Sequence, residues 1–489
     1  MLVWLYQYLL KRIAPEEYAL YPVVMSVMAF LPLLTVVLTS GVGRYVVEAY
    51  AKGDERGVTQ IVSTMFPLHL AAGVLILLGG GFFAWNIDHI LTIAPNRVWD
   101  ARIMMGLAVF SFAAGLVVAP FGVGLYVRQK FVLANLIGIG SELLRIGILF
   151  LLLFAVSTRV LWVAVAVTAA GLCHLAVNQV ISRRLVPALR FRLSEIRWSR
   201  ARVLTGFGFW NFVSNLADTI RTSADVIILN KLATPVDVTC FYLGSLPFQK
   251  VHEGVMLAKG PLGPAVTAMH ATSQKERLRN VYLRGGRYGL WFTLLLAVPL
   301  IVFRRELFAL YAPAQYAAAG TVMALLLLMF PFVYGNNMMF NLAPATAQIR
   351  PLAWRMLVTN AANLGVTLYL VGGLGLGATG SALGTFLTFS LTHPVLMLPL
   401  GLRLADVRLR QWIRQVLFPG VLPGLCALPV WIVLQVVCQP GTWLTLGACT
   451  VAGLAVYALV WLLFALRQDD RAQLHRLRLF GLRARPAIA

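Results

Sequence analysis

The chain has 489 residues, of which 60% are hydrophobic and 12% charged, and its mean hydropathy is +0.80. A water-soluble domain of this length cannot bury so large an apolar fraction, so the composition excludes a soluble protein and predicts a polytopic membrane protein. The net charge is +23, from 41 Lys and Arg against 18 Asp and Glu.

The predicted elements are membrane-spanning helices, each of which needs roughly 20 apolar residues to cross the hydrocarbon. Continuous apolar runs of this length exclude a β-barrel, whose strands alternate over about 10 residues. Thirteen such stretches occur, near residues 19–42, 61–85, 103–126, 131–156, 159–181, 205–229, 236–258, 284–303, 318–342, 353–373, 378–401, 413–437 and 443–466.

The first ten residues, MLVWLYQYLL, are apolar but span only about 15 Å as a helix at 1.5 Å per residue. We therefore expect an incomplete first helix. No basic region precedes the run and no small-residue cleavage site follows it, which argues against a signal peptide.

The Lys and Arg residues between the stretches are distributed asymmetrically. If Lys11 and Arg12 face outward, the inner loops and the tail carry 30 of them and the outer loops 8. This is the pattern of the positive-inside rule, so the charge indicates membrane topology and not nucleic-acid binding. It predicts a multi-pass membrane protein whose basic loops and C-terminus lie in the cytoplasm.

An internal repeat relates the two halves. The segment LKRIAPEEYALY (10–21) is echoed by LNKLATPVDVTCFY (229–242), and Tyr21 and Tyr242 are 221 residues apart. We expect an all-α fold of parallel six-helix repeats plus two C-terminal helices, fourteen spans with the first truncated. The predicted parts are an N-terminal lobe, a basic cytoplasmic linker, a C-terminal lobe, an extra helix pair and a basic tail, at residues 1–182, 183–204, 205–401, 402–466 and 467–489.

A polar stripe runs along the stretch near 205–229. On a helical wheel its polar residues fall within an arc of about 120°, and they are Asn211, Ser214, Asn215, Asp218, Arg221, Thr222 and Asp225. A charge at the centre of a helix costs roughly 2.5–3.5 kcal/mol on insertion scales, so these side chains must face protein or water. Two interpretations remain: a buried ion triad around Arg221, and a stripe that lines a water-filled cavity.

Two further pairs of opposite charge lie three residues apart and can each share a helix face, Glu142 with Arg145 and Lys250 with Glu253. Arg44, near the inner end of the stretch at 19–42, can meet a lipid phosphate or anchor at the headgroups. Asn336, Asn337 and Asn341 mark the stretch at 318–342. The lone His69, His174 and His393 and the five cysteines are interpreted as packing residues, without a metal site.

Enzyme motifs are not supported. GLGATG (375–380) matches GxGxxG but follows an apolar helix, so we expect a tight hairpin with Gly380 and Gly384 on a close-packed face. No GxxxxGK[ST], HExxH or nucleophile elbow occurs. The sequence predicts a protein that is not an enzyme and has no cofactor.

The segments KRIAPEEYALYPV, SGVGRYVVEAYAKGDER, SADVIILNKL and GLGATGSALGTFL resemble the polysaccharide-exporter and O-antigen flippase branch of the multidrug/oligosaccharidyl-lipid/polysaccharide flippase superfamily. The resemblance implies two lobes around a cavity that opens alternately to each side. It also implies that a polyprenyl-diphosphate-linked oligosaccharide moves from the cytoplasmic to the outer leaflet.

On this hypothesis basic and amide side chains bind the substrate in the cavity, namely Arg221, Arg145, Lys250, Arg44, Asn211 and Asn215. Acidic residues couple the cycle to H⁺ or Na⁺, namely Asp218, Asp225, Glu142 and Glu253. The expected partners are the lipid-linked glycan, membrane lipids and glycan-synthesis proteins, with a monomeric chain and no nucleic acid. Two alternatives stay open: a cation-coupled multidrug exporter, and a non-transporting membrane scaffold for glycan synthesis.

Overall fold

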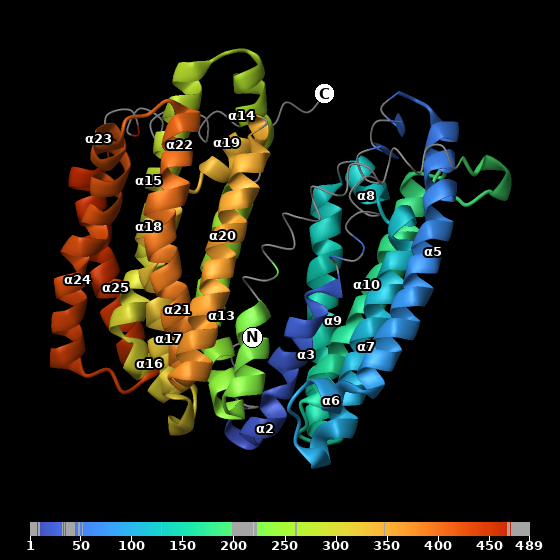
Figure 1. Cartoon of the computed structure of the whole chain (residues 1–489), viewed down its shortest axis with the longest axis horizontal. Helices are drawn as coiled ribbons and strands as arrows, with labels where there is room; N and C mark the ends of the chain where they lie inside the picture. The colour runs from blue at the N-terminus through green and yellow to red at the C-terminus, as the bar shows by residue number, and fades with distance from the viewer. Residues whose placement is uncertain are drawn as a thin grey trace. The chain divides into compact units, whose positions relative to one another are not determined.

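The computed structural model describes residues 7, 10–31, 33, 35, 45–46, 49–50, 52–128, 130–197, 219, 223–259, 262–346, 348–466 and 470. In this part of the chain the regular structure is helical throughout and contains no β-strand (Figure 1), so the predicted all-α class is confirmed. Ten of the described helices are long and apolar enough to cross a membrane. The count of fourteen spans stays a prediction.

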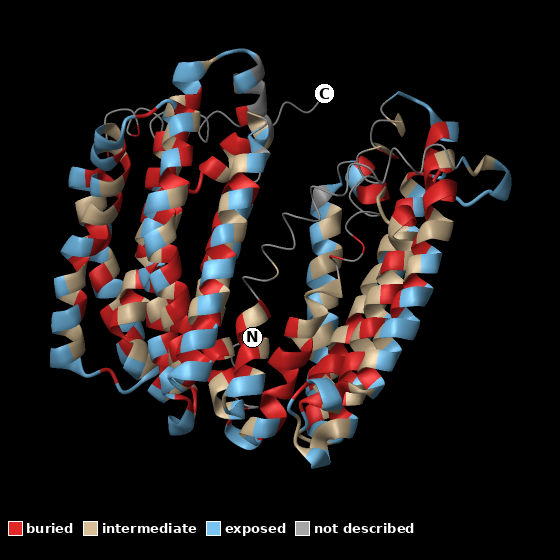
Figure 2. Cartoon of the chain, in the orientation of Figure 1, coloured by how far each residue is buried: buried red, intermediate tan, exposed pale blue. Residues whose placement is uncertain are grey.

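The long helices expose apolar side chains along their lengths, as lipid-facing helices do. Figure 2 shows exposed residues along α5 (Glu55–Trp85) and α24 (Phe418–Cys438). Phe82 on α5 and Val437 on α24 are both 74% exposed. The chain is therefore a multi-pass membrane protein.

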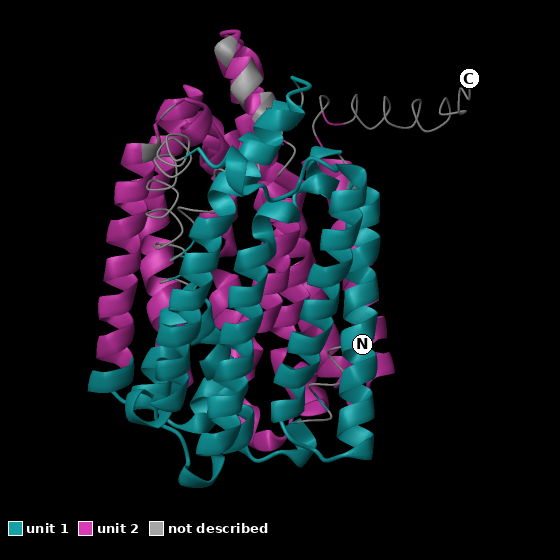
Figure 3. Cartoon of the chain, turned by 90° about the vertical axis from the view of Figure 1, so that its right-hand side faces the viewer, with its two compact units in different colours: residues 1–239, 371–377 teal, residues 240–370, 378–489 magenta. Residues whose placement is uncertain are grey.

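Contacts divide the chain into two compact units (Figure 3). Unit 1 contains residues 1–239 and 371–377, and unit 2 contains residues 240–370 and 378–489. The lobe limits predicted from the internal repeat stay a prediction.

Unit 1 is built on four long helices, α5, α7 (Val98–Val118), α9 (Phe131–Ala155) and α10 (Leu161–Leu185). Its shorter elements are α2 (Pro15–Tyr18), α3 (Leu20–Met28), α6 (Ile87–Ile90), η1 (Pro95–Arg97), η2 (Ala119–Phe121), α8 (Gly124–Val127) and η3 (Leu193–Glu195).

Helix α5 begins within a polar segment, before the apolar stretch predicted at 61–85. The Asp54 carboxylate caps it by accepting from the Gly57 amide at 2.7 Å, as N-cap aspartates do. Its 31 residues span about 46 Å, more than the hydrocarbon thickness of about 30 Å. The polar first turns therefore extend beyond the membrane core.

Unit 2 is centred on α15 (Lys275–Val302), which packs on α24 and on α17 and α18. The other elements are α13 (Pro235–Lys259, whose first turn lies in unit 1), α14 (Leu262–Ala271), α16 (Arg304–Tyr311), η4 (Ala314–Tyr316), α17 (Ala318–Leu328), α18 (Phe330–Tyr334), α19 (Met339–Ala345), α20 (Ile349–Leu368), α21 (Gly377–Thr392), η6 (His393–Met397), α22 (Leu398–Ala405), α23 (Leu409–Trp412), η7 (Ile413–Leu417), α25 (Trp443–Val460) and η8 (Trp461–Ala465). The segment η5 (Tyr369–Gly373) begins in unit 2 and ends in unit 1, to which Gly377 also belongs.

The stretch predicted as one helix near 318–342 is interrupted, and this prediction was wrong in detail. Helices α17, α18 and α19 replace it, with a turn over residues 335–338. At this turn the Trp412 indole donates to the Gly335 carbonyl at 3.2 Å, and the Tyr282 hydroxyl donates to Asn336 Oδ1 at 2.6 Å. These partners are far away in the sequence, whereas the local signal for the turn is the run Gly335-Asn336-Asn337.

The GLGATG segment forms the expected hairpin between η5 and α21. Gly375 and Gly377 have φ of +64° and +53°, values that favour glycine. At Gly384 a Cβ atom would lie 3.3 Å from the Thr367 backbone of α20. The close helix packing predicted at Gly384 is confirmed.

Candidate functional site

The predicted polar stripe lies mostly outside the described residues. This holds for Asn211, Ser214, Asn215, Asp218, Arg221 and Thr222, and Arg44 also lies outside them. Asp225 is described; it belongs to a helical run over 223–232 and is 5% exposed. Its carboxylate is therefore buried in protein and does not face lipid.

The expected pairing of Glu142 with Arg145 is confirmed. Both residues lie on α9, one helical turn apart, and Arg145 Nη2 donates to Glu142 Oε2. The Arg145 side chain is 19% exposed, whereas that of Glu142 is 57% exposed. The carboxylate is therefore the accessible member of the pair.

A cavity of about 1000 Å³ lies in unit 1 among α7, α9 and α10. Most of its lining is apolar or glycine, including Gly115, Gly138 and Gly171. The polar side chains in the lining are Thr35, Ser111, Ser141, Glu142 and His174. The structure thus brings a carboxylate and an imidazole to one cavity within a membrane-spanning helix bundle.

His174 is the residue of this cavity whose position the sequence interpretation missed, because it was taken as a packing residue. The other two lone histidines do pack. His69 is fully buried, with Nδ1 2.8 Å from the Met65 carbonyl, and His393 stacks on Phe389 with ring centroids 5.2 Å apart. The sequence feature that indicates a cavity at His174 is the presence of glycines, which lack side chains, at Gly115, Gly138 and Gly171.

The second predicted pair is also confirmed, in unit 2. On α13, Lys250 Nζ donates to Glu253 at 2.9 Å, and the two side chains are 70% and 57% exposed. His252 Nδ1, between them in sequence, lies 2.8 Å from the Tyr334 hydroxyl. Of the predicted substrate-binding cations that the structure describes, Arg145 and Lys250, each is thus paired with a carboxylate three residues away.

A polar seam that the sequence analysis missed runs between α20 and α21. Asn363 Nδ2 donates to Thr385 Oγ1 at 3.2 Å across it. All its side chains are buried, and they are Thr359, Asn360, Asn363, Thr367, Ser381, Thr385 and Thr388. The i, i+4 spacing of Thr359, Asn363 and Thr367 puts them on one helix face, and this spacing could have identified the seam.

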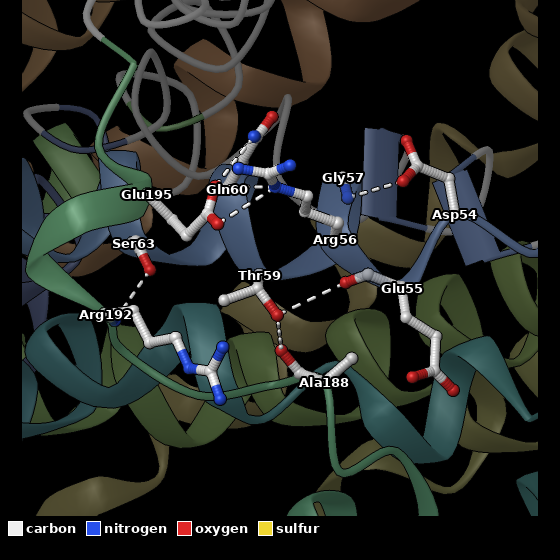
Figure 4. A network of polar contacts seen from close by, with 10 residues as sticks. All are labelled: Asp54, Glu55, Arg56, Gly57, Thr59, Gln60, Ser63, Ala188, Arg192 and Glu195. Atoms are coloured by element: carbon white, nitrogen blue, oxygen red, sulfur yellow. Dashed lines mark hydrogen bonds and ion pairs between the residues drawn. The ribbon is translucent and has the colours of Figure 1, made fainter.

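Polar side chains also hold the chain that follows α10 against the first turns of α5 (Figure 4). We call the segment 186–197 the clasp. The Thr59 hydroxyl donates to the Ala188 carbonyl at 2.9 Å, and the Arg192 amide donates to Ser63 Oγ at 2.9 Å. The α5 residues in contact, Arg56, Thr59, Gln60, Ser63 and Thr64, have the 3–4 spacing of one helix face.

Glu195 is the one carboxylate in the clasp. It accepts from Gln60 Nε2 at 2.8 Å and from Arg56 Nε at 2.9 Å. These hydrogen bonds, Gln60 first and then Arg56, lower the pKa of the Glu195 carboxyl below its usual value because they favour the charged form.

At the opposite end of unit 1, Glu17 of the PEEY segment joins three parts of the chain. Its Oε2 lies 2.6 Å from Arg97 Nη2, and its Oε1 accepts from the Val160 amide at 3.0 Å, just before α10 begins. The side chain is 5% exposed. Among the described residues no group of three His, Cys, Asp or Glu is placed to hold a metal ion.

The helical fold is shared with two solved membrane proteins, the second of which is a member of the multidrug/oligosaccharidyl-lipid/polysaccharide (MOP) superfamily. Lipid II flippase MurJ in an inward closed conformation matches with a TM-score of 0.64 and 12% identity, over 91% of this chain and 97% of that one. An inward-facing multidrug resistance MATE family transporter matches with a TM-score of 0.66 and 14% identity, over 82% and 93%.

The chain belongs to the polysaccharide biosynthesis protein family, whose model matches residues 3–250. It is 21% identical over 486 residues to the uncharacterized membrane protein EpsK of Bacillus subtilis (strain 168), which covers 96% of this chain and 93% of that protein. The resemblance noted in the sequence is thereby confirmed at the level of the family. The two solved structures that share its fold are a flippase and a transporter, and neither is an enzyme.

Proposed function

We propose that the protein moves a polyprenyl-diphosphate-linked oligosaccharide, or a related polysaccharide precursor, from the cytoplasmic to the outer leaflet by alternating access. The observation that carries this proposal is the combination of family and fold. The family model concerns polysaccharide biosynthesis, and the fold matches a lipid II flippase along 97% of that chain.

The diphosphate is the part of such a substrate that most resists crossing hydrocarbon. Arg145 offers a planar set of donors suited to phosphate oxygens, but Glu142 occupies one of them. Protonation of Glu142, which lines the unit 1 cavity, removes the competing charge and frees Arg145 for an anion. The pair therefore provides a physical link between proton binding and substrate binding.

The other residues take the roles that the sequence suggests. Arg221, Lys250, Arg44, Asn211 and Asn215 contact the substrate. The acids Asp218, Asp225 and Glu253 tune or couple the cycle through H⁺ or Na⁺. The protein acts as a monomer in the inner membrane, with its basic loops and C-terminus in the cytoplasm, beside glycan-synthesis proteins.

A direct test uses the full chain reconstituted in vesicles with a polyprenyl-diphosphate-linked sugar. Movement between leaflets is measured by the fraction of sugar that a membrane-impermeant glycosidase can reach. We expect protein-dependent movement that Arg145→Gln slows by about tenfold or more, the effect of losing one hydrogen bond to a charged group. The double variant Glu142→Gln, Arg145→Gln controls for the carboxylate that the single change leaves unpaired.

Normal movement in both variants contradicts the assigned role of the pair. Absence of any protein-dependent movement contradicts the transport proposal and leaves the scaffold alternative. The similar TM-score to a multidrug transporter favours one second candidate, a cation-coupled drug exporter. Protein-dependent export of a cationic dye from the same vesicles, with an unmoved glycolipid, would establish that candidate instead.

A further inference from the structure

A polar pocket of about 590 Å³ lies in unit 2, away from the intramembrane pairs. It is formed where three apolar helical spans end: α15 at its first turn, α22 at its last turn, and the run Leu409–Cys438 at its beginning. The residues that define its chemistry are Arg279, Arg403, Asp406, Arg408 and Gln411. Because the spans end here, the pocket is placed at the membrane–water boundary.

The charges in this pocket do not balance. The lining contains three arginines and one carboxylate, that of Asp406. This carboxylate is paired with one of the three, Arg279, whose Nη2 lies 2.9 Å from Asp406 Oδ2. Within the described ranges no carboxylate lies within ion-pair distance of Arg403 or Arg408. Two guanidinium groups of this concave site thus have no paired carboxylate in the described part of the chain.

The backbone adds to the positive potential. Arg408 stands at the N-cap of the run Leu409–Cys438 and supplies no side-chain cap. The N-terminus of a helix carries a partial positive charge, so a basic residue there is unfavourable and an anion is favourable. The side-chain charges and the helix end therefore favour the same kind of ligand.

Asp406 adopts a left-handed backbone conformation at the C-terminal end of α22. It follows α22 with φ +51° and ψ +53°, where glycine is usual. Its side chain is 82% exposed, so it is the accessible competitor for the arginines. An entering anion would displace it from Arg279 without disturbing a buried contact.

At the corresponding place in unit 1 the carboxylate is more deeply buried. There Glu195 accepts from both Arg56 and Gln60 and is 12% exposed in its side chain. In both places an ion pair joins the start of a long helix to the chain that follows a later span of the same half. In unit 1 the carboxylate has two side-chain partners and is nearly buried, whereas in unit 2 Asp406 is paired with one arginine and is 82% exposed.

We propose that the Arg279, Arg403 and Arg408 pocket binds a phosphate group at the membrane surface, as the headgroup of an anionic phospholipid or as a soluble phosphate. Guanidinium groups bind phosphate oxygens through paired hydrogen bonds, and basic pockets at helix ends bind lipid headgroups. This site does not depend on the transport proposal, because none of its residues belongs to the pairs assigned to the substrate.

The test uses the full chain in detergent and native mass spectrometry to measure binding of phosphatidylglycerol against phosphatidylcholine. We expect Arg403→Gln and Arg408→Gln each to weaken phosphatidylglycerol binding by about tenfold, the effect of losing one hydrogen bond to a charged group. Arg410→Gln is the matched control: Arg410 is an exposed arginine of the same helix start that does not line the pocket.

Asp406→Asn tests the site in the opposite direction, because a misfolded variant would lose binding instead of gaining it. Asparagine tolerates the left-handed conformation, and the change removes the competing carboxylate, so we expect tighter binding. Inorganic phosphate, titrated without lipid, distinguishes the sources. Binding of inorganic phosphate with the same variant pattern and no lipid preference supports a site for soluble phosphate.

Three outcomes overturn the proposal. The first is wild-type protein that binds neither phosphatidylglycerol in preference to phosphatidylcholine nor inorganic phosphate. The second is an Arg410→Gln loss as large as that of Arg403→Gln, which would indicate general surface charge. The third is weaker binding by Asp406→Asn.

Discussion

At the scale of single residues, Glu17 shows how a short motif acts through distant partners. The PEEY segment that contains it was recognisable as a family motif, but its contacts were not predictable. Arg97 is 80 residues away and Val160 is 143 residues away, and no local spacing connects them. The tertiary fold alone brings these loops to one carboxylate.

Glu17→Gln is expected to lower the stability of the protein by about 1–3 kcal/mol, because it removes a hydrogen-bonded charge from a buried site. The measurement is the apparent Tm of the purified protein. Glu16→Gln is the control, since Glu16 is the exposed neighbour on the same turn. Equal Tm values for the two variants would show that the Glu17 contacts contribute nothing.

The charge pairs of the candidate site, in contrast to the Glu17 contacts, were predictable from sequence. Glu142 with Arg145 and Lys250 with Glu253 were predictable because each pair is separated by one helical turn. His174 was not, because its place beside Glu142 depends on how α9 and α10 pack. Sequence spacing therefore identifies polar pairs within one helix and polar helix faces, but it does not tell which helix such a face contacts.

At the scale of elements, the apolar runs were enough to locate the described long helices, because the membrane requires their length. The interruption at 335–338 was missed because hydropathy alone defined the stretch; Gly335, Asn336 and Asn337 are residues that favour turns, and Trp412 and Tyr282 contact this turn from other helices. The contacts that fix one helix against another depend on small residues at particular places. The pair α24 and α25 gives the clearest example.

Gly453→Ala on α25 is expected to be strongly destabilising. A Cβ atom at Gly453 would lie 2.0 Å from Nε1 of the fully buried Trp431, so the indole or the helix must move, at a cost of about 1–3 kcal/mol. Gly447→Ala on the same helix meets no atom within 4 Å and is the control. Thermal unfolding should show a lower Tm for the first variant and an unchanged or higher Tm for the second.

A result in which both α25 variants behave alike would contradict the close contact of α24 and α25 at Trp431. The comparison is well controlled because both changes add one methyl group to the same helix. The intrinsic gain in helix propensity is then equal in the two variants. Any difference in Tm measures the contact itself.

At the scale of the whole molecule, the two halves use the same kind of tie. In unit 1, α5 is joined to the chain after α10 through Arg56 and Glu195. In unit 2, α15 is joined to the chain after α22 through Arg279 and Asp406. In the predicted repeat these are the third and sixth spans of each half, so the ties lie at matching places.

The clasp should loosen when Glu195 loses its charge. Glu195→Gln is expected to raise, severalfold, the rate at which trypsin cleaves after Arg190, Arg192 and Arg197 at neutral pH. Glu55→Gln is the control. Glu55 is an exposed acid beside Arg56 in the first turn of α5, and its side chain does not touch the clasp. Unchanged cleavage in Glu195→Gln would contradict a holding role for this carboxylate.

The same contact predicts a dependence on pH. The pKa of Glu195 is lowered in the folded protein, so its contribution is fully present above the usual carboxyl pKa. It is lost as the pH falls through the lowered value. Amide hydrogen exchange of residues 186–197, corrected for intrinsic rates, should rise over that acidic range in wild type and stay level in Glu195→Gln.

The clasp can also be considered as a peptide that is bound by a helix. Side chains of α5 contact the backbone at Ala188, Arg190 and Arg192, every second residue. Because the ligand is covalently attached, its effective concentration is on the order of millimolar. A synthetic peptide of the same sequence would therefore displace it only near that concentration, and a break elsewhere in the linker would free the segment to be exchanged.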